Sequence, residues 1–177
     1  MTEPPPAPKG CVFADPLVAR IVGFIRRIGI VVEDGEVGEP LPCPGIRLTA
    51  GGMVVDPARL RHPGDLLHEA GHLAVMPPER RVAVERDAGA DPAEEMMAIA
   101  WSYAAAIHLG IEPAIVFHAA GYRGASAALL ENFSEGRYLA VPMLQWLGMT
   151  YDEKRAAAAG VAAYPAMRCW LRGGAAS

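Results

Sequence analysis

The sequence has few cysteines, no long apolar run and no excess of positive charge. Its three cysteines, Cys11, Cys43 and Cys169, form no C-x-x-C pair. A sparse, odd count is typical of a reducing compartment and of thiols that are structural or incidental. No apolar run reaches the roughly 18 residues that a membrane span needs, and the start Met-Thr-Glu-Pro-Pro-Pro lacks the regions of a signal peptide. We therefore expect a soluble, cytoplasmic protein without a membrane partner.

The charge balance argues against a nucleic-acid partner. The 177 residues carry 16 basic and 20 acidic side chains, for a formal net charge of −4, whereas nucleic-acid binding usually needs a basic patch. Hydrophobic residues make up 52% and charged residues 20% of the chain, which excludes a disordered protein. A chain of this size can bury a core without metal, so a metal site here is expected to serve chemistry.

Prolines and glycines divide the chain into one leading helix, a few strands and a series of helices. Asp15-Pro16 begins a helix, Gly29 ends it, and a strand follows at 30–32. Residues 46–49 and 53–55 predict a β-hairpin, and the polar residues 77–91 a solvated connection. This order predicts an α+β fold with a small sheet on a mainly helical body. The other expected helices cover 66–76, 92–109, 113–121, 125–132, 139–147, 151–163 and 165–171.

Composition also suggests the domain limits. Residues 1–14 are proline-rich and read as a flexible tail. Residues 15–177 show no repeat and no second composition zone, so they are assigned to one domain, with a catalytic core at about 15–123 and a helical extension at about 124–177. Trp146 and Trp170 are expected in the core. The late helices either pack on the domain or form a homodimer.

One motif carries the chemistry: His68-Glu69-Ala70-Gly71-His72, an H-E-x-x-H. Residues i and i+4 share one face of a helix, so both imidazoles can bind one metal ion. Glu69 can then act as general base on a metal-bound water. Gly71 has no side chain and would let another backbone approach closely, at a cost of about 1 kcal/mol in helix propensity.

A third ligand is needed, because catalytic zinc takes three protein ligands and keeps an open position. Glu94 and Glu95 are the candidates. Asp91-Pro92-Ala93-Glu94 reads as N-cap, N1, N2 and N3, so Glu94 suits a capping box and Glu95 is the favoured ligand. Ala98 would permit close packing against the H-E-x-x-H helix. The alternative for both glutamates is a solvated first turn.

This pattern resembles the gluzincin metallopeptidases, in which a glutamate on the next helix is the third ligand, and its layout is most similar to the minimal ImmA/IrrE-type domain. The resemblance covers residues 15–110 and rests on the H-E-x-x-H together with Glu95-x-x-Ala98-x-x-Trp101. It implies a zincin-like fold, a Zn²⁺ cofactor, and a position near the substrate-pairing edge strand for residues 53–55. Residues 125–177 do not align with the family.

A zinc peptidase also needs a donor for the oxyanion of its intermediate. His118 and Tyr122 are the predicted catalytic candidates, with His108 and Tyr103 as further options. The leading hypothesis is a zinc-dependent metallopeptidase that acts on a protein or peptide. The alternative is a metal-binding regulatory or interaction module of ImmA/IrrE type with little or no peptidase activity, and a weaker option is a hydrolase of non-peptide amides.

Overall fold

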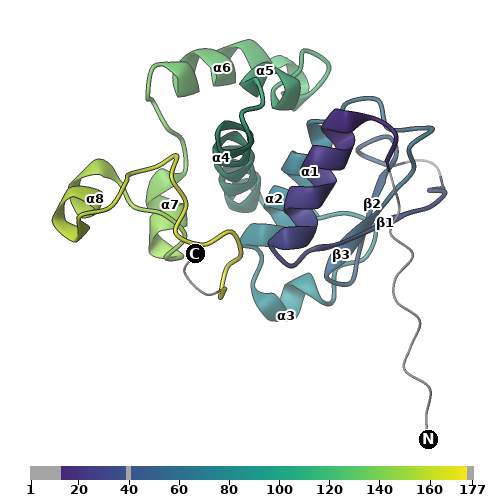
Figure 1. The fold of residues 1–177 in the computed structure, drawn as a ribbon, viewed down its shortest axis with the longest axis horizontal. Coiled ribbons are helices and arrows are strands. Elements are labelled where there is room, and N and C mark those ends of the chain that lie inside the picture. Colours follow the sequence, from purple (N-terminus) through teal and green to yellow (C-terminus); the bar gives the residue numbers. More distant parts are fainter. Residues whose placement is uncertain (1–12, 39–40, 175–177) are drawn as a thin grey trace, which may run out of the picture.

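The chain folds as an α+β protein in which a small mixed sheet packs on a larger helical body (Figure 1). The structure is a computed structural model that describes residues 13–38 and 41–174. The sheet lies at one side, α1 and α2 follow, and α4 lies beyond them (Figure 1). The expected fold class is confirmed at this level. No helix within the described ranges is both long and apolar enough to cross a bilayer.

The first helix, α1 (Pro16–Arg27), forms where the sequence predicted it. Asp15 caps it by accepting hydrogen bonds from the backbone nitrogens of Leu17 and Val18. Its apolar face is buried against the core, as the helical spacing requires. Phe13 is also buried in the core, so the expected tail ends before it; residues 1–12 lie outside the described residues.

The sheet contains β1 (Val31–Asp34), β2 (Ile46–Thr49) and β3 (Gly52–Val55), in the order β1-β3-β2. β3 is parallel to β1 and antiparallel to β2. The hairpin is confirmed, and residues 53–55 belong to the central strand, which lies beside both edge strands because β1 pairs with its second side. Both outer strands are partly covered: Arg26 donates to the carbonyl of Val32, and Leu48 forms a bridge with Arg86.

Two helices carry the H-E-x-x-H motif and the candidate third ligand. They are α2 (Asp65–Val75) and α4 (Pro92–Leu109), and the side chain of Asp91 caps α4. At their crossing, a Cβ added to Gly71 would lie 2.9 Å from the carbonyl oxygen of Ala98 and 3.2 Å from its Cα. The predicted close approach at Gly71 and Ala98 is therefore confirmed.

The connection at 77–91 is only partly solvated, contrary to the expectation. It contains α3 (Pro78–Arg81), and the guanidinium of Arg81 donates to the carbonyls of Leu73 at 2.7 Å and Met76 at 3.2 Å. These carbonyls end α2 and have no partner within the helix, so a cation there stabilises the helix terminus. Arg81 also donates to the carbonyl of Arg172.

The remaining chain covers the far side of α4. The predicted helix at 165–171 is wrong: Met167 instead forms an antiparallel bridge with Thr150. Trp146 is 82% exposed rather than in the core, whereas the carbonyl of Trp170 accepts a hydrogen bond from Trp101. The late elements are α5 (Pro113–Val116), the 3₁₀ turn η1 (Tyr122–Gly124), α6 (Ser126–Ser134), α7 (Val141–Trp146) and α8 (Glu153–Ala159).

The C-terminal segment returns to the two helices of the motif. The hydroxyl of Tyr164 donates to the carbonyl of Ala100 in α4 at 2.9 Å. The backbone nitrogen of Arg172 donates to the carbonyl of Ala74 in α2 at 2.8 Å. Of the two expectations for the late chain, packing on the domain is thus observed for residues 164–172.

The crossing of α2 and α4 yields a stability prediction. We expect Gly71→Ala to destabilise the fold by about 1–3 kcal/mol, because the new methyl group would meet the Ala98 backbone. Gly23→Ala in α1 is the matched control, since its Cβ would meet only the end of Arg27 at 3.5 Å and it should gain helix propensity. Urea unfolding of both variants tests this. Equal effects at the two glycines would contradict the close crossing.

Candidate metal centre

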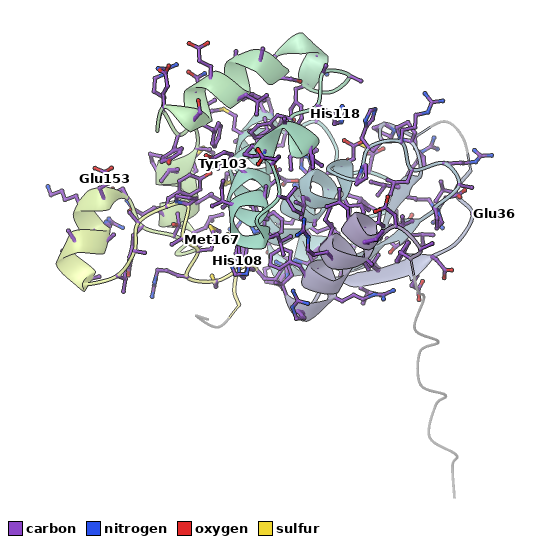
Figure 2. The ribbon with its side chains drawn as sticks, turned by 45° about the horizontal axis from the view of Figure 1, so that its top comes forward. Glu36, Tyr103, His108, His118, Glu153 and Met167 are labelled. Carbon is purple, nitrogen blue, oxygen red and sulfur yellow. The ribbon has the colours of Figure 1, made fainter. Side chains whose placement is uncertain are left out.

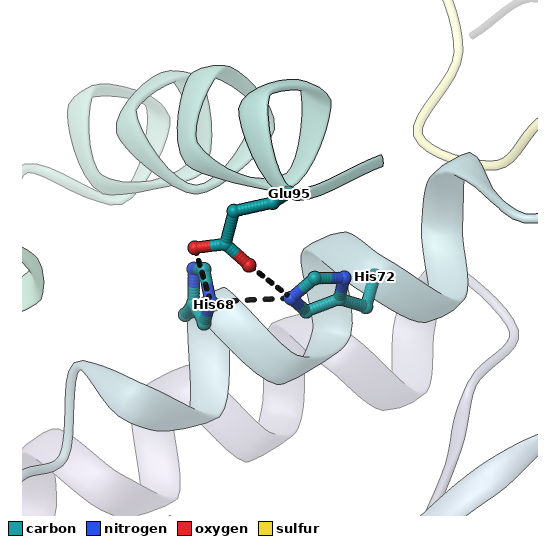
Figure 3. A group of neighbouring side chains, drawn as sticks. All are labelled: His68, His72 and Glu95. Carbon is teal, nitrogen blue, oxygen red and sulfur yellow. Dashed lines mark hydrogen bonds and ion pairs between the residues drawn. The ribbon is translucent and has the colours of Figure 1, made fainter. Parts of the chain in front are cut away.

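Three side chains from α2 and α4 converge on one point (Figure 3). The Nε2 atoms of His68 and His72 are 3.2 Å apart. Glu95 places Oε1 at 3.6 Å from Nε2 of His68 and Oε2 at 3.1 Å from Nε2 of His72. Of the two glutamates, the structure therefore brings the favoured candidate, Glu95, to the histidines.

These separations fit a single small cation. Nitrogen and oxygen ligands at about 2.0–2.1 Å from a tetrahedral centre lie about 3.3–3.4 Å from one another. The separation of 3.2 Å between the two Nε2 atoms is close to that value, and the two oxygens of Glu95 each approach a different histidine, at 3.6 and 3.1 Å. The two imidazoles share a face of α2 because they are four residues apart. The side chains of His68 and His72 are almost buried, while that of Glu95 is 46% exposed, so solvent reaches the group from the side of Glu95.

Glu69 is the neighbour of His68, one of the candidate metal ligands, and is buried. Its Oε1 accepts a hydrogen bond from the thiol of Cys43 at 3.0 Å. From the sequence, this cysteine was expected to be structural or incidental. In the structure, its thiol contacts the candidate general base. Burial, reinforced by the charge of Glu69, raises the pKa of the Cys43 thiol far above its usual range, so it remains a protonated donor. No local signal in the sequence links positions 43 and 69.

Glu94 is neither in the ligand group nor in a capping box. Its buried carboxylate accepts from Nη1 of Arg80 at 2.5 Å, while its Oε1 lies 3.7 Å from Nδ1 of His72. The capping box is wrong because the side chain turns toward Arg80 instead of back to the amide of Asp91. Arg80 lies in the connection that was expected to be solvated.

His118, one of the predicted catalytic residues, contacts Asp65 rather than the ligand group. Its Nε2 lies 2.8 Å from Oδ1 of Asp65, and its ring stacks on that of His62 at 3.8 Å. Asp65 was missed, although its position three residues before His68 places it on the same side of the helix. The contact is close because a Cβ on Gly64 would lie 2.0 Å from the carbonyl oxygen of Ile115, so the two backbones touch.

Tyr122, the other predicted catalytic residue, reaches the ligand group. Its ring makes an edge contact with the ring of His68, with centroids 5.3 Å apart. Its hydroxyl is buried and has no hydrogen-bond partner among the described residues. The backbone of Tyr122 has a φ of 55°, a conformation that non-glycine residues rarely adopt and that often accompanies function. Burial and the charges of Asp65 and Glu95 raise its pKa.

The two further oxyanion options lie elsewhere. His108 packs against Phe24 and Trp170 and lies beside Met167, apart from His118 (Figure 2). Tyr103 donates its hydroxyl to the carbonyl of Phe133. Neither side chain contributes to the group of His68, His72 and Glu95.

Carboxylates give the surroundings of the two histidines a negative charge. Hydrogen bonds from His68 and His72 hold the pKa of Glu95 well below its usual range. Burial opposes a charge on His72, but the carboxylates of Glu94 and Glu95 outweigh it and raise the pKa of His72 to about 9. These carboxylates thus stabilise the imidazolium of His72 at the place where a bound metal ion would supply the positive charge. A negatively charged environment of this kind suits a cation site.

Comparisons with known proteins identify no relative of this chain. A scan against protein-family models finds no match, and searches of curated proteins and of solved structures find no significant similarity. The resemblance to gluzincins therefore rests on the sequence motif alone.

The raised pKa of His72 predicts how the stability of the metal-free protein depends on pH. The contribution of protonated His72 should be complete below about pH 6.5 and lost as pH rises through about 9. A shift of this size corresponds to roughly 3 kcal/mol. Urea unfolding of chelator-treated protein at about pH 6.5 and pH 9.5 measures it. His72→Gln should remove the difference and the exposed control His108→Gln should keep it; an unchanged difference in His72→Gln would contradict the assignment.

Proposed function

We propose that this protein is a zinc-dependent peptidase in which His68, His72 and Glu95 hold the metal ion and Glu69 is the general base. The observation that carries the proposal is the convergence of these three side chains: the Nε2 atoms of the two histidines lie 3.2 Å apart, and the two carboxylate oxygens of Glu95 lie 3.6 and 3.1 Å from them. Two histidines and a glutamate form a donor set typical of catalytic zinc, which leaves a fourth position for water or substrate. The substrate is a protein or a peptide.

Glu69 is placed to move the proton. Bound zinc would lower the pKa of a water molecule and polarise the scissile carbonyl. The carboxylate of Glu69 would accept a proton from that water and pass it to the leaving amine. The thiol of Cys43 donates to Oε1 at 3.0 Å, and this hydrogen bond limits rotation of the carboxylate.

Tyr122 is the proposed donor to the oxyanion. Its unpartnered buried hydroxyl lies on a ring that contacts His68, and a raised pKa keeps the hydroxyl protonated at neutral pH. His118 is assigned a positioning role instead. His118 contacts Asp65 of α2, and Ser126 donates to the carbonyls of His118 and Gly121. These contacts anchor the turn that contains Tyr122.

Metal content and hydrolysis together test the function. We expect about one equivalent of zinc in protein purified without added metal, and its loss in His72→Ala. Glu69→Gln should retain zinc and lose hydrolysis by about 10²–10⁴-fold, because a general base contributes about this much. The assay is cleavage of a mixed peptide library followed by mass spectrometry.

Glu79→Gln is the matched control, since Glu79 is an exposed glutamate in α3. It should leave both zinc content and hydrolysis unchanged. Absence of zinc from the wild type would overturn the proposal. A wild type that binds zinc but hydrolyses no more than Glu69→Gln would make the protein a metal-binding module, the alternative of regulatory type.

Removal of the Tyr122 hydroxyl gives a separate prediction. Tyr122→Phe should keep zinc and stability, because no described residue pairs with the hydroxyl. It should lower kcat by about 10²-fold, as loss of one oxyanion donor does. KM should change little. Tyr138→Phe, at a half-buried tyrosine packed on Tyr164, is the control. An unchanged kcat in Tyr122→Phe would remove Tyr122 from the mechanism.

A further inference from the structure

A buried carboxylate lies behind one of the metal ligands. Glu94 is only 5% exposed, and its Oε1 is 3.7 Å from Nδ1 of His72. Within the part of the chain that the structure describes, neither atom has a hydrogen-bond partner, and both are shielded from solvent. Nδ1 is the ring nitrogen opposite Nε2, the atom that faces His68 and Glu95. The carboxylate of Glu94 therefore faces Nδ1, the ring nitrogen of His72 that would remain free if Nε2 bound a metal ion.

Two unpartnered buried polar atoms that face each other are costly unless they pair. Each buried unsatisfied group costs about 1–3 kcal/mol, and the separation of 3.7 Å exceeds the usual hydrogen-bond length by roughly 0.5–1 Å. A small rotation of the ring or the carboxylate closes that gap. When Nε2 binds a metal ion, a neutral imidazole carries its hydrogen on Nδ1, and that hydrogen needs an acceptor.

The other oxygen of Glu94 is held by Arg80. Nη1 of Arg80 donates to Oε2 at 2.5 Å, and its Nη2 donates to the carbonyl of Ala88 at 2.6 Å. The guanidinium is thus anchored at both ends of the connection between α2 and α4, since Arg80 belongs to α3 and Ala88 precedes α4. It fixes the carboxylate and offsets the cost of burying its charge.

We propose that Arg80 and Glu94 form a positioning pair for the metal centre, in which Glu94 accepts the Nδ1 hydrogen of His72 and Arg80 holds Glu94 in place. The inference rests on the proposed metal centre but does not depend on peptidase activity. It gives the connection at 77–91 a role in metal affinity, because its arginine orients the carboxylate that orients the ligand.

Glu94→Gln is the sharpest variant. Glutamine has one acceptor oxygen, whereas Arg80 and His72 both offer hydrogens, so one of the two donors would lose its partner. We expect zinc affinity to fall by about 10–100-fold, the usual effect of removing such a partner. Arg80→Met should weaken zinc binding in the same direction but less, and the double variant should be no weaker than Glu94→Gln alone.

The measurement is competition for zinc against a chromophoric chelator at one pH, together with urea unfolding of the metal-free proteins. Arg20→Met, at an exposed arginine of α1, and Glu79→Gln are the matched controls, and both should bind zinc like the wild type. A merely structural pair would lower the stability of the metal-free protein in Glu94→Gln and leave the zinc affinity of the folded fraction unchanged, which would overturn the proposal.

A second measurement needs no variant. In the zinc-loaded wild type, nitrogen-15 NMR should show a slowly exchanging hydrogen on Nδ1 of His72; rapid exchange there would overturn the proposal even if Glu94→Gln failed to fold. The two proposals fail in different ways. A wild type that binds no zinc removes the metal centre altogether, whereas equal zinc affinity in wild type and Glu94→Gln removes only the role of the pair.

Discussion

The close crossing of α2 and α4 at Gly71 and Ala98 is the constraint on which the candidate metal centre depends. A side chain at position 71 would push the two helices apart, and the carboxylate of Glu95 reaches the imidazoles of α2 only because the backbones nearly touch. Two rigid helices also hold the ligand atoms without relying on loops. Glycine at position 71 lowers the helix propensity of α2, but it permits the close crossing that brings the candidate ligands together.

Supporting contacts surround this crossing, and each comes from a different part of the chain. Cys43 precedes β2 and contacts Glu69, Arg80 extends from α3 to Glu94, and Tyr122 follows α5 and reaches His68. The C-terminal segment joins through Arg172 at the end of α2. Such contacts limit the motion of the candidate ligands and of Glu69, and restricted motion is what preorganisation of a site requires.

Predictions from the sequence succeeded where the signal is local. The cap at Asp15, the hairpin at 46–55 and the long helix that begins after Asp91 all follow from short-range backbone chemistry. They failed where distant partners decide. Residues 165–171, for example, form no helix because Met167 pairs with Thr150.

The candidate ligands divide in the same way. The spacing of His68 and His72 by itself determined that two imidazoles share one helix face, because four residues complete about one turn. The sequence could only favour Glu95 over Glu94. Neighbouring residues on a helix point about 100° apart, so the choice depends on how α4 is rotated about its own axis. Tertiary structure decided it: the rotation of α4 on α2 directs Glu95 to the histidines, and Arg80 draws Glu94 to the opposite side of His72.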